Sequence, residues 1–310
     1  MCTWFLRFPA PPAATLVESP PQARAPTLER MLSRADARAA LPDWRREAFD
    51  LIAAPGEPWP GVCAPAVLRE FGVLDAAAVY LATPVHYVAT MTRVHLAADG
   101  LIALQAAEAA RLATDFNRAF GPGEQLLASP SGALYCRFER PLLAETHDPA
   151  QILGQDIGPY QARGRDAAAL RRLASEIEMW LHEHAINRAR ESRGAARLGG
   201  LWLWGGGEPL ERSPRLSGWA DGEDVLFAAL NHAGEAGRET RSGVVCVAAT
   251  PGSPDWLSVE TRWLLPAMRA LAARRIGRLM LSAGAHTHVL DTGSRRRFWR
   301  RARPWWEYLG

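Results

Sequence analysis

Three polar side chains near the middle of the chain have types and spacing that suit the binding of an anion or a sugar hydroxyl. His184, Asn187 and Arg190 follow one another at intervals of three residues, so on a helix they wind along one edge. Imidazole, amide and guanidinium groups can all donate hydrogen bonds to phosphate, carboxylate or hydroxyl oxygens. We interpret this helix end as a candidate ligand-binding site. The alternative is that His184 is a core histidine that only supports the helix.

A glycine triplet at Gly205, Gly206 and Gly207 follows the next apolar segment. Glycine lets the backbone approach a ligand closely, and successive N–H groups can hold an anion. We therefore include the triplet in the candidate site, with a flexible loop as the alternative. In the preceding segment, 201–204, leucine and tryptophan alternate, so a strand would direct the two residue types to opposite faces, both of them buried.

A helix and a strand must position these residues. An apolar stripe at helical spacing, which His184 continues, predicts a helix over 166–193 and a partly buried His184; the stripe consists of Leu170, Leu173, Ile177, Trp180 and Leu181. Helical and strand-like patterns then alternate, at 200–204, 223–233, 243–249, 256–274 and 277–282. Such alternation predicts βαβ units on a mostly parallel sheet. Residues 285–290 are expected to return beside the last strand as a hairpin around Ala283-Gly284.

The expected fold class is α/β, with a mostly parallel sheet in the C-terminal half and a less regular α+β lobe before it. The predicted lobe 1–140 begins with a strand at Thr3–Phe8 and a proline-rich connector at 9–26. Residues 141–165, rich in proline, glycine and aspartate, are predicted to connect it to a second lobe, 166–310. A single continuous domain is the alternative, since 310 residues can form one large core or two modest ones.

The composition excludes several classes of protein. All 36 basic residues are arginine, which excludes Schiff-base lysines, a Walker A phosphate loop and a kinase lysine. The four cysteines have no Cys-x-x-Cys spacing, so neither a zinc site nor a disulfide framework is expected, and a reducing cytoplasm fits best; they are Cys2, Cys63, Cys136 and Cys246. The N-terminal residues lack the pattern of a signal peptide, and no apolar run is long enough to span a membrane.

Two segments carry a resemblance to a known family. Residues 184–190 read His-Ala-Ile-Asn-Arg-Ala-Arg, and residues 199–207 read Gly-Gly-Leu-Trp-Leu-Trp-Gly-Gly-Gly. They resemble the motif His-Pro-(Val/Ile)-Asn-x-x-Arg and Asn-x-(Leu/Ile)-Trp-Leu-Trp-Gly-x-Gly of archaeal-type cofactor-independent phosphoglycerate mutases. Nearly the whole chain resembles bacterial regulatory proteins of the RpfE type, with further matching segments at 25–32, 83–86 and 297–304. It departs from the family pattern at Ala185, Gly199 and Thr83, where proline, asparagine and aspartate are usual.

The resemblance implies a scaffold of the alkaline phosphatase superfamily, in which two divalent metal ions activate a serine. That superfamily places an Asp-Gly pair after the first strand and an Asp-His pair after a late strand. Here the first strand runs into Phe8-Pro9-Ala10-Pro11 and the late strand into Ser282-Ala283-Gly284-Ala285. We therefore expect no catalytic residues, no metal centre and no cofactor. His286 and His288 share a strand face, so a metal site at this pair remains an alternative.

These observations lead to one functional hypothesis and two alternatives. We expect a cytoplasmic regulatory or accessory protein of the RpfE type that binds a small phosphorylated metabolite, with a protein partner as a further option. The first alternative is an active cofactor-independent phosphoglycerate mutase or phosphohydrolase. The second is nucleic-acid binding through residues 295–308, where six arginines lie among five aromatic residues. Packing of this tail on the body is favoured over nucleic-acid binding, because arginine stems can cover apolar surface while their charges stay solvated.

Overall fold

The computed structural model describes residues 2–8, 24–41, 43–231, 238–247, 256–283 and 286–308. The chain forms two compact units: Met1–Trp59 together with Pro214–Gly310, and Pro60–Ser213. Unit 1 therefore combines both ends of the chain, and unit 2 is its middle. No helix among the described residues has the length and hydropathy needed to cross a membrane.

Unit 1 is built on a six-stranded sheet that confirms the α/β fold class. Its strand order is β2 (Asp36–Ala39), β11 (His286–Asp291), β10 (Arg278–Ala283), β1 (Thr3–Phe8), β9 (Gly243–Cys246) and β8 (Trp219–Gly222). The four strands β10, β1, β9 and β8 are parallel, and β11 and β2 extend the sheet in antiparallel pairing. The hairpin return after β10 is confirmed, although residues 284 and 285 of its turn lie outside the described residues.

The central place of β1 explains why the compact units differ from the lobes expected at 1–140 and 166–310. The first strand lies between β10 and β9, both near the other end of the sequence. Pairing between strands so far apart leaves no local trace, because the apolar pattern reports which residues are buried and not which strand lies beside them. Most of the proline-rich segment expected after β1 lies outside the described residues, which resume at Arg24.

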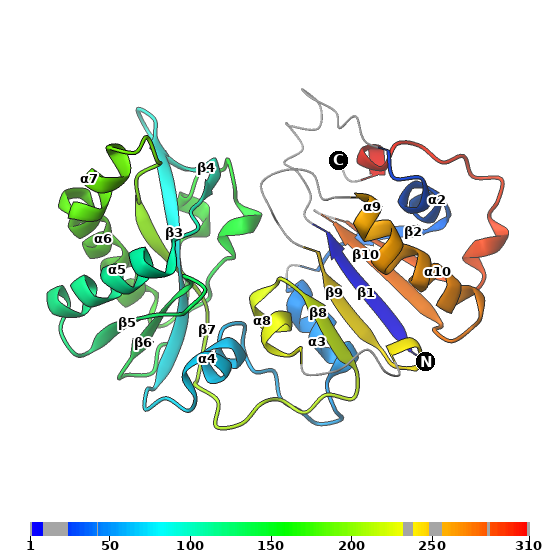
Figure 1. The fold of residues 1–310 in the computed structure, drawn as a ribbon, viewed down its shortest axis with the longest axis horizontal. Helices are drawn as coiled ribbons and strands as arrows, with labels where there is room; N and C mark the ends of the chain where they lie inside the picture. Colours follow the sequence, from blue (N-terminus) through cyan, green and yellow to red (C-terminus); the bar gives the residue numbers. More distant parts are fainter. Residues whose placement is uncertain are drawn as a thin grey trace. The chain divides into compact units, whose positions relative to one another are not determined.

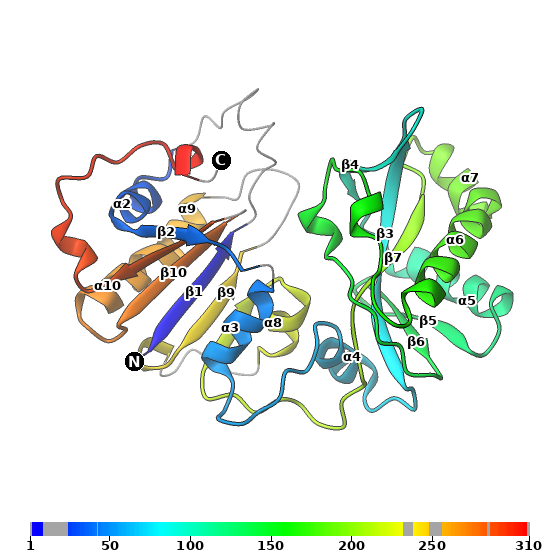
Figure 2. The same cartoon turned by 180° about the vertical axis from the view of Figure 1, so that it is seen from behind.

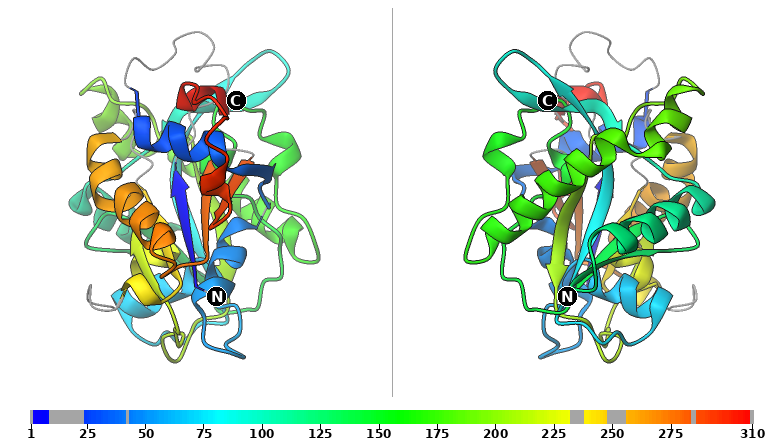
Figure 3. Two further views of the ribbon diagram at one scale, coloured as in Figure 1. Left: turned by 90° about the vertical axis from the view of Figure 1, so that its right-hand side faces the viewer. Right: turned by 90° about the vertical axis from the view of Figure 1, so that its left-hand side faces the viewer.

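Helices cover both faces of this sheet. Helices α2 (Pro26–Arg34), α9 (Trp256–Val259) and α10 (Leu265–Ala272) lie over one face, and a short π-helical segment, Glu260–Leu264, joins the last two (Figure 1; Figure 3, left). This face is lined by Trp4, Leu6 and Phe8 of β1. The opposite face carries α3 (Trp44–Ile52; Figure 2). The Trp44 ring of this helix stacks on Phe5. Trp44 also contacts Phe227 of α8 (Val225–Ala229).

Unit 2 has an entirely antiparallel sheet. Its strands are β3 (Ala78–Ala89), β4 (Val94–Leu101), β5 (Glu124–Ala128), β6 (Leu134–Phe138) and β7 (Gly200–Gly207), in the order β4-β3-β6-β5, with β7 also paired to β3. The helices of this unit are α4 (Ala64–Phe71), α5 (Ala106–Ala119), α6 (Ala167–Glu183) and α7 (Ala185–Glu191). Helices α5, α6 and α7 lie together on one side of the sheet (Figure 3, right).

The expectation that β7 belongs to the parallel sheet is wrong. Strand β7 pairs antiparallel with β3, as Thr83 opposite Trp202 illustrates. The predicted alternation of its side chains does occur, because Leu201 and Leu203 join the apolar core with α6, whereas the indole N–H of Trp202 donates to the His147 carbonyl oxygen at 2.7 Å. Residues 141–165, expected to connect two lobes, lie within unit 2 and form two short 3-10 turns, Pro149–Gln151 and Gly158–Tyr160.

The arginine- and tryptophan-rich tail packs on unit 1 through its end. Trp305, in the 3-10 turn Trp305–Tyr308, is fully buried in the same core as Trp4 and Met31. Arg297 donates hydrogen bonds to the Arg34 carbonyl oxygen at 3.0 Å and to the Asp36 carboxylate at 2.6 Å. These contacts support a packing role for this part of the tail.

Replacement of Trp305 by alanine is therefore expected to destabilise unit 1 by about 3–5 kcal/mol, because a fully buried indole would leave a cavity in the core. Urea unfolding followed by circular dichroism measures the loss. Trp299→Ala is the matched control, since its side chain is largely exposed, and we expect a change within about 0.5 kcal/mol. Equal effects of the two variants would show that the tail is not docked through Trp305.

Candidate functional site

The helix end predicted as a ligand site begins with a break in the helix. The single helix expected over 166–193 is two helices, α6 and α7, because His184 has an extended ψ of 141° and ends one helix while it caps the next. The His184 Nδ1 accepts a hydrogen bond from the Ile186 N–H at 3.2 Å, and its Nε2 lies 3.4 Å from an Asp115 carboxylate oxygen. Both ring nitrogens of His184 therefore have protein neighbours.

Asn187 links helices and strand through its amide group. Its Nδ2 donates to the carbonyl oxygens of Leu181 at 2.8 Å and Leu198 at 3.0 Å, and its Oδ1 accepts from the Leu198 N–H at 2.8 Å. The side chain is 1% exposed. Both amide protons and the oxygen are thus used by the backbone of α6 and of the connector between α7 and β7.

Arg190 holds the same connector from the next turn of α7. Its Nε donates to the Ala196 carbonyl oxygen at 2.7 Å, and its Nη1 donates to Glu108 of α5 at 2.8 Å. Both side chains of this ion pair are mostly buried, at 9% and 15% exposed. The contacts of Asn187 and Arg190 give both residues a structural role, which sequence spacing alone could not distinguish from a ligand site.

The glycine triplet lies at the other end of β7 from this helix end. Seven steps separate Gly200 from Gly207, so at about 3.3 Å per residue the two ends of the strand are roughly 23 Å apart. A side chain on Gly206 would meet the Tyr80 ring at 2.2 Å, and Gly205 has φ +64°. Packing and backbone conformation therefore require glycine at positions 205 and 206, and the structure does not bring the triplet together with the helix end.

A second polar cluster lies where the parallel strands of unit 1 end. Arg7 of β1 is paired in register with Ser282 of β10 and Cys246 of β9, and Ser282 is opposite Thr287 of β11. Directly opposed residues share a face, so these four side chains lie on the α3 side of the sheet. In open α/β sheets, ligands bind at this carboxyl edge of the strands.

Hydrogen bonds and ring contacts hold this cluster together. The Arg7 Nη1 donates to the Ser282 Oγ at 2.7 Å, and the Thr287 hydroxyl donates to the same oxygen at 3.3 Å. The guanidinium carbons of Arg7 and Arg45 lie 5.0 and 4.5 Å from the centre of the Trp44 ring, a geometry in which cation and ring attract. We name Arg7, Arg45, Ser282 and Thr287 the carboxyl-edge cluster.

Two further groups complete the surroundings of the carboxyl-edge cluster. Asp224 accepts from the Arg45 Nε at 2.8 Å and also caps α8 through the Leu226 N–H, so it fixes Arg45 in place. The Cys246 thiol is fully buried, and burial is the main reason that its pKa is raised well above the usual value. The Cys246 thiol therefore stays protonated and uncharged beside the cluster.

The histidine pair considered as a metal site lies on the other face of the same sheet. The His286 and His288 rings are 6.3 Å apart, and the His288 ring contacts that of Tyr308. Among the described residues, the buried Nδ1 of His286 and Nε2 of His288 have no hydrogen-bond partner. Within the described parts of the chain, no three His, Cys, Asp or Glu residues are grouped so that they could hold a metal ion.

The sequence pattern did not predict the carboxyl-edge cluster, because it indicated a site at the glycines and the helix end. A signal was present, since Arg7 is a charged residue within the otherwise apolar strand Thr3–Phe8, and Ser282 is a hydroxyl residue near the end of another strand. Such residues at the ends of parallel strands can face a ligand. Their meeting depends on the pairing of β1 with β10, which the sequence pattern does not report.

Substitution of Asn187 by alanine is expected to destabilise unit 2 by about 2–4 kcal/mol, because it leaves buried backbone groups of Leu181 and Leu198 without partners. The measurement is the urea midpoint of the full chain. Asn231→Ala provides the control at a partly exposed asparagine of unit 1. A small effect at Asn187, comparable with that of the control, would contradict the structural role and return Asn187 to the candidate ligand site.

The His184 cap predicts a dependence of stability on pH. The pKa of His184 is lowered, chiefly by burial and also by Arg111 and Arg188, against the opposing effect of Asp115. The unfolded chain therefore binds the proton more tightly, and the contribution of His184 to stability is present above its ordinary pKa of about 6.5 and is lost as the pH falls through the lower folded pKa. His184→Asn, which can still cap α7, should show a smaller loss of unfolding free energy between pH 7 and pH 5. An identical pH profile for both proteins would refute this role.

Comparisons with known proteins relate part of the chain to phosphoglycerate mutases. No protein-family model matches the chain. Over 68 residues it is 37% identical to the 2,3-bisphosphoglycerate-independent phosphoglycerate mutase of Methanothrix thermoacetophila, an alignment that covers 22% of this chain and 17% of that enzyme. The match thus spans about a sixth of the enzyme's length.

Two solved structures are also similar at low scores. The cofactor-independent phosphoglycerate mutase from Thermoplasma acidophilum aligns with a TM-score of 0.39 and 13% identity, over 93% of this chain and 88% of that one. A protein from Pyrococcus horikoshii aligns with a TM-score of 0.37 and 12% identity, over 93% and 87% of the two chains. What the comparisons give for this chain is a local sequence similarity to a phosphoglycerate mutase.

Proposed function

We propose that this chain is a cytoplasmic regulatory or accessory protein, related to phosphoglycerate mutases, that binds a small phosphorylated metabolite at the carboxyl-edge cluster. The resemblance to regulatory proteins of the RpfE type supports the regulatory part of the proposal. The local similarity to a phosphoglycerate mutase supports a phosphorylated ligand. A partner protein would then bind the metabolite-bound form and the free form of this chain with different affinities.

The observation that carries the proposal is the meeting of two guanidiniums and two hydroxyls at one edge of the sheet. Arg7 and Ser282 are joined by a hydrogen bond, and Arg45 is held by Asp224 against the same tryptophan ring as Arg7. Arginine binds phosphate and carboxylate oxygens through its planar fork of N–H donors, and serine and threonine hydroxyls add further donors. The cluster therefore gathers groups of the chemical types that bind a small anion.

The helix end is a weaker place for this ligand than the sequence suggested. The Asn187 amide and the Arg190 guanidinium are hydrogen-bonded to backbone oxygens and to Glu108, and a ligand would have to replace those bonds. The loss of buried hydrogen bonds is costly. We assign the metabolite to the carboxyl-edge cluster because two guanidiniums meet there. Asn187 and Arg190 hold the connector to β7, and His184 caps α7.

The residues of the carboxyl-edge cluster do not fit a two-metal phosphoryl-transfer centre. Such a centre needs several carboxylate and histidine ligands around two ions. Within the described part of the chain, the carboxylate beside the cluster is Asp224, which is bonded to Arg45 and to the α8 N-terminus.

An active phosphoglycerate mutase is the second candidate, because of the 68-residue similarity to such an enzyme. This candidate requires a serine that receives the phosphoryl group and divalent metal ions that activate it. A manganese-dependent conversion of 3-phosphoglycerate to 2-phosphoglycerate by the purified chain would favour it. Binding of 3-phosphoglycerate without turnover, with and without manganese, would favour the regulatory proposal.

The binding proposal predicts a thermal shift with millimolar 3-phosphoglycerate. Ligand at about 100 times its Kd should stabilise the chain by roughly 2.7 kcal/mol. Arg7→Gln should lose the shift, because it removes the guanidinium from the edge of the sheet. The His184→Ala/Arg190→Ala double variant should keep it, once its own loss of stability is taken into account.

Two outcomes would contradict this assignment. Absence of a shift in the unmodified protein, with or without manganese, would reject a phosphoglycerate ligand. A shift that persists in Arg7→Gln and disappears in the double variant would place the ligand at the helix end instead. Inorganic phosphate serves as a further probe, since a shift with phosphate alone would indicate recognition of the phosphoryl group and not of the three-carbon acid.

A further inference from the structure

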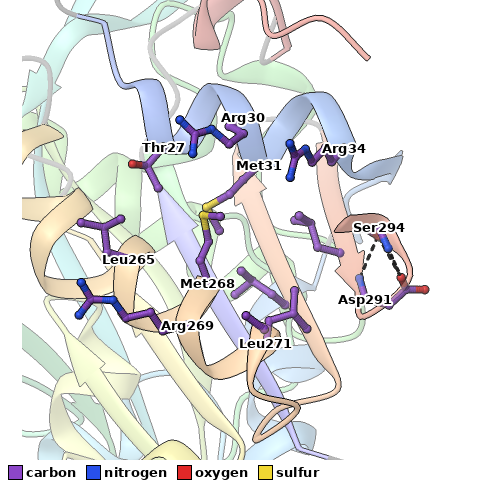
Figure 4. Close-up of a pocket in the computed structure, with 13 residues that line it drawn as sticks. Thr27, Arg30, Met31, Arg34, Leu265, Met268, Arg269, Leu271, Asp291 and Ser294 are labelled. Carbon is purple, nitrogen blue, oxygen red and sulfur yellow. Dashed lines mark hydrogen bonds between the residues drawn. The ribbon is translucent and has the colours of Figure 1, made fainter. Parts of the chain in front are cut away.

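A separate groove lies on the opposite face of the unit 1 sheet, between α2 and α10. It has a cavity volume of about 420 Å³, which lies within the usual range for small-molecule sites, about 300–1,000 Å³. Figure 4 shows Met31 of α2 and Met268 of α10 directed toward each other across the groove. Leu279 of β10 and Leu290 of β11 also line it, and both are buried, so the groove has an apolar floor.

Three arginines surround this apolar floor. Arg30 and Arg34 extend from α2, and Arg269 extends from α10 on the other side (Figure 4). Within the part of the chain that the structure describes, none of these three guanidiniums forms a hydrogen bond or an ion pair with another side chain. Arg30 and Arg34 are four residues apart on one helix, where like charges repel each other. The described lining of the groove thus carries a net positive charge, since Asp291 is its one acidic residue.

The one carboxylate that lines the groove is already engaged. The Asp291 Oδ1 accepts hydrogen bonds from the Gly293 N–H at 2.8 Å, from the Ser294 N–H at 2.8 Å and from the Ser294 hydroxyl at 3.0 Å. The Ser294 hydroxyl bond is the main reason that the pKa of Asp291 is lowered. Asp291 is thus a stable anion that closes the turn after β11, and it leaves the three arginines to face whatever enters the groove.

We propose that this groove binds an amphipathic carboxylate, a medium-length acyl chain that ends in a carboxyl group. The methionine and leucine side chains would contact the chain, and unbranched methionine side chains adapt readily to such ligands. One or two of the three arginines would pair with the carboxylate, for which their N–H geometry is suited. The site shares no residue with the carboxyl-edge cluster and lies on the other face of the sheet, so it goes beyond the proposed metabolite site.

Decanoate tests the proposal directly, with isothermal titration calorimetry on the full chain. Acetate has the same head group without the chain, and decanol has the same chain without the charge. We expect decanoate to bind measurably and each of the two controls to bind at least tenfold more weakly. Equal binding of decanol and decanoate would show a purely apolar groove and overturn the role of the arginines, and absence of decanoate binding would overturn the proposal.

Two variants locate the bound decanoate. Arg30→Gln/Arg269→Gln removes charge from both sides of the groove at exposed positions, so the fold should be retained and affinity should fall at least tenfold. Met268→Glu, at a partly exposed position, places a negative charge among the apolar lining and should abolish binding. Arg172→Gln, an exposed arginine of unit 2, is the matched control and should bind like the unmodified protein. Unchanged affinity in the first two variants, with folding verified by circular dichroism, would refute this location.

Discussion

The pairing of β1 with β9 and β10 is the interaction on which unit 1 depends. It places six residues from the N-terminal end of the chain in the centre of a sheet whose other parallel strands come from residues 219–283. The side chains of β1 then alternate between the two faces of the sheet. Trp4, Leu6 and Phe8 fill the core beneath α2 and α10, whereas Phe5 and Arg7 face α3. Without this pairing, Arg7 and Ser282 of the carboxyl-edge cluster would not meet.

Unit 2 relies on a different kind of constraint, the hydrogen bonding of a buried amide. Asn187 and Arg190 attach the connector that follows α7 to the helices, and this attachment sets where β7 enters the sheet beside β3. Leu201 and Leu203 then reach the core beneath α6. On the other face of β7, Trp202 donates to the His147 carbonyl oxygen and Trp204 donates to the Thr83 hydroxyl. The polar residues that resembled a binding site are thus parts of the packing of this unit.

Local features of the structure could be predicted from the sequence, because local patterns report burial. The apolar stripe from Leu170 to Leu181 predicted α6, and the leucine and tryptophan alternation predicted the two faces of β7. The α/β class followed from the alternation of strands and helices. The break at His184 was not predicted, because the apolar stripe continues through it and conceals the capping role of the imidazole.

Nonlocal features could not be predicted, because they depend on which strands pair. Strand β7 has the apolar character of a parallel strand, yet it pairs antiparallel with β3. Spacing made His184, Asn187 and Arg190 candidates for a site. It does not reveal that Asn187 is hydrogen-bonded to Leu198 and that Arg190 is hydrogen-bonded to Glu108. The carboxyl-edge cluster draws on residues that are up to 280 positions apart in sequence, from Arg7 to Thr287, so only the folded chain shows it.

The most direct test of binding at the carboxyl-edge cluster is a crystal structure of the chain soaked with 3-phosphoglycerate. We expect electron density for the phosphoryl or carboxyl group within hydrogen-bond distance of Arg7 and of Arg45, Ser282 or Thr287. Density at His184 and Arg190, with their present hydrogen bonds broken, would contradict it and restore the helix end as the binding site. A fully soaked crystal with no density at either place would contradict the binding of a phosphorylated three-carbon acid.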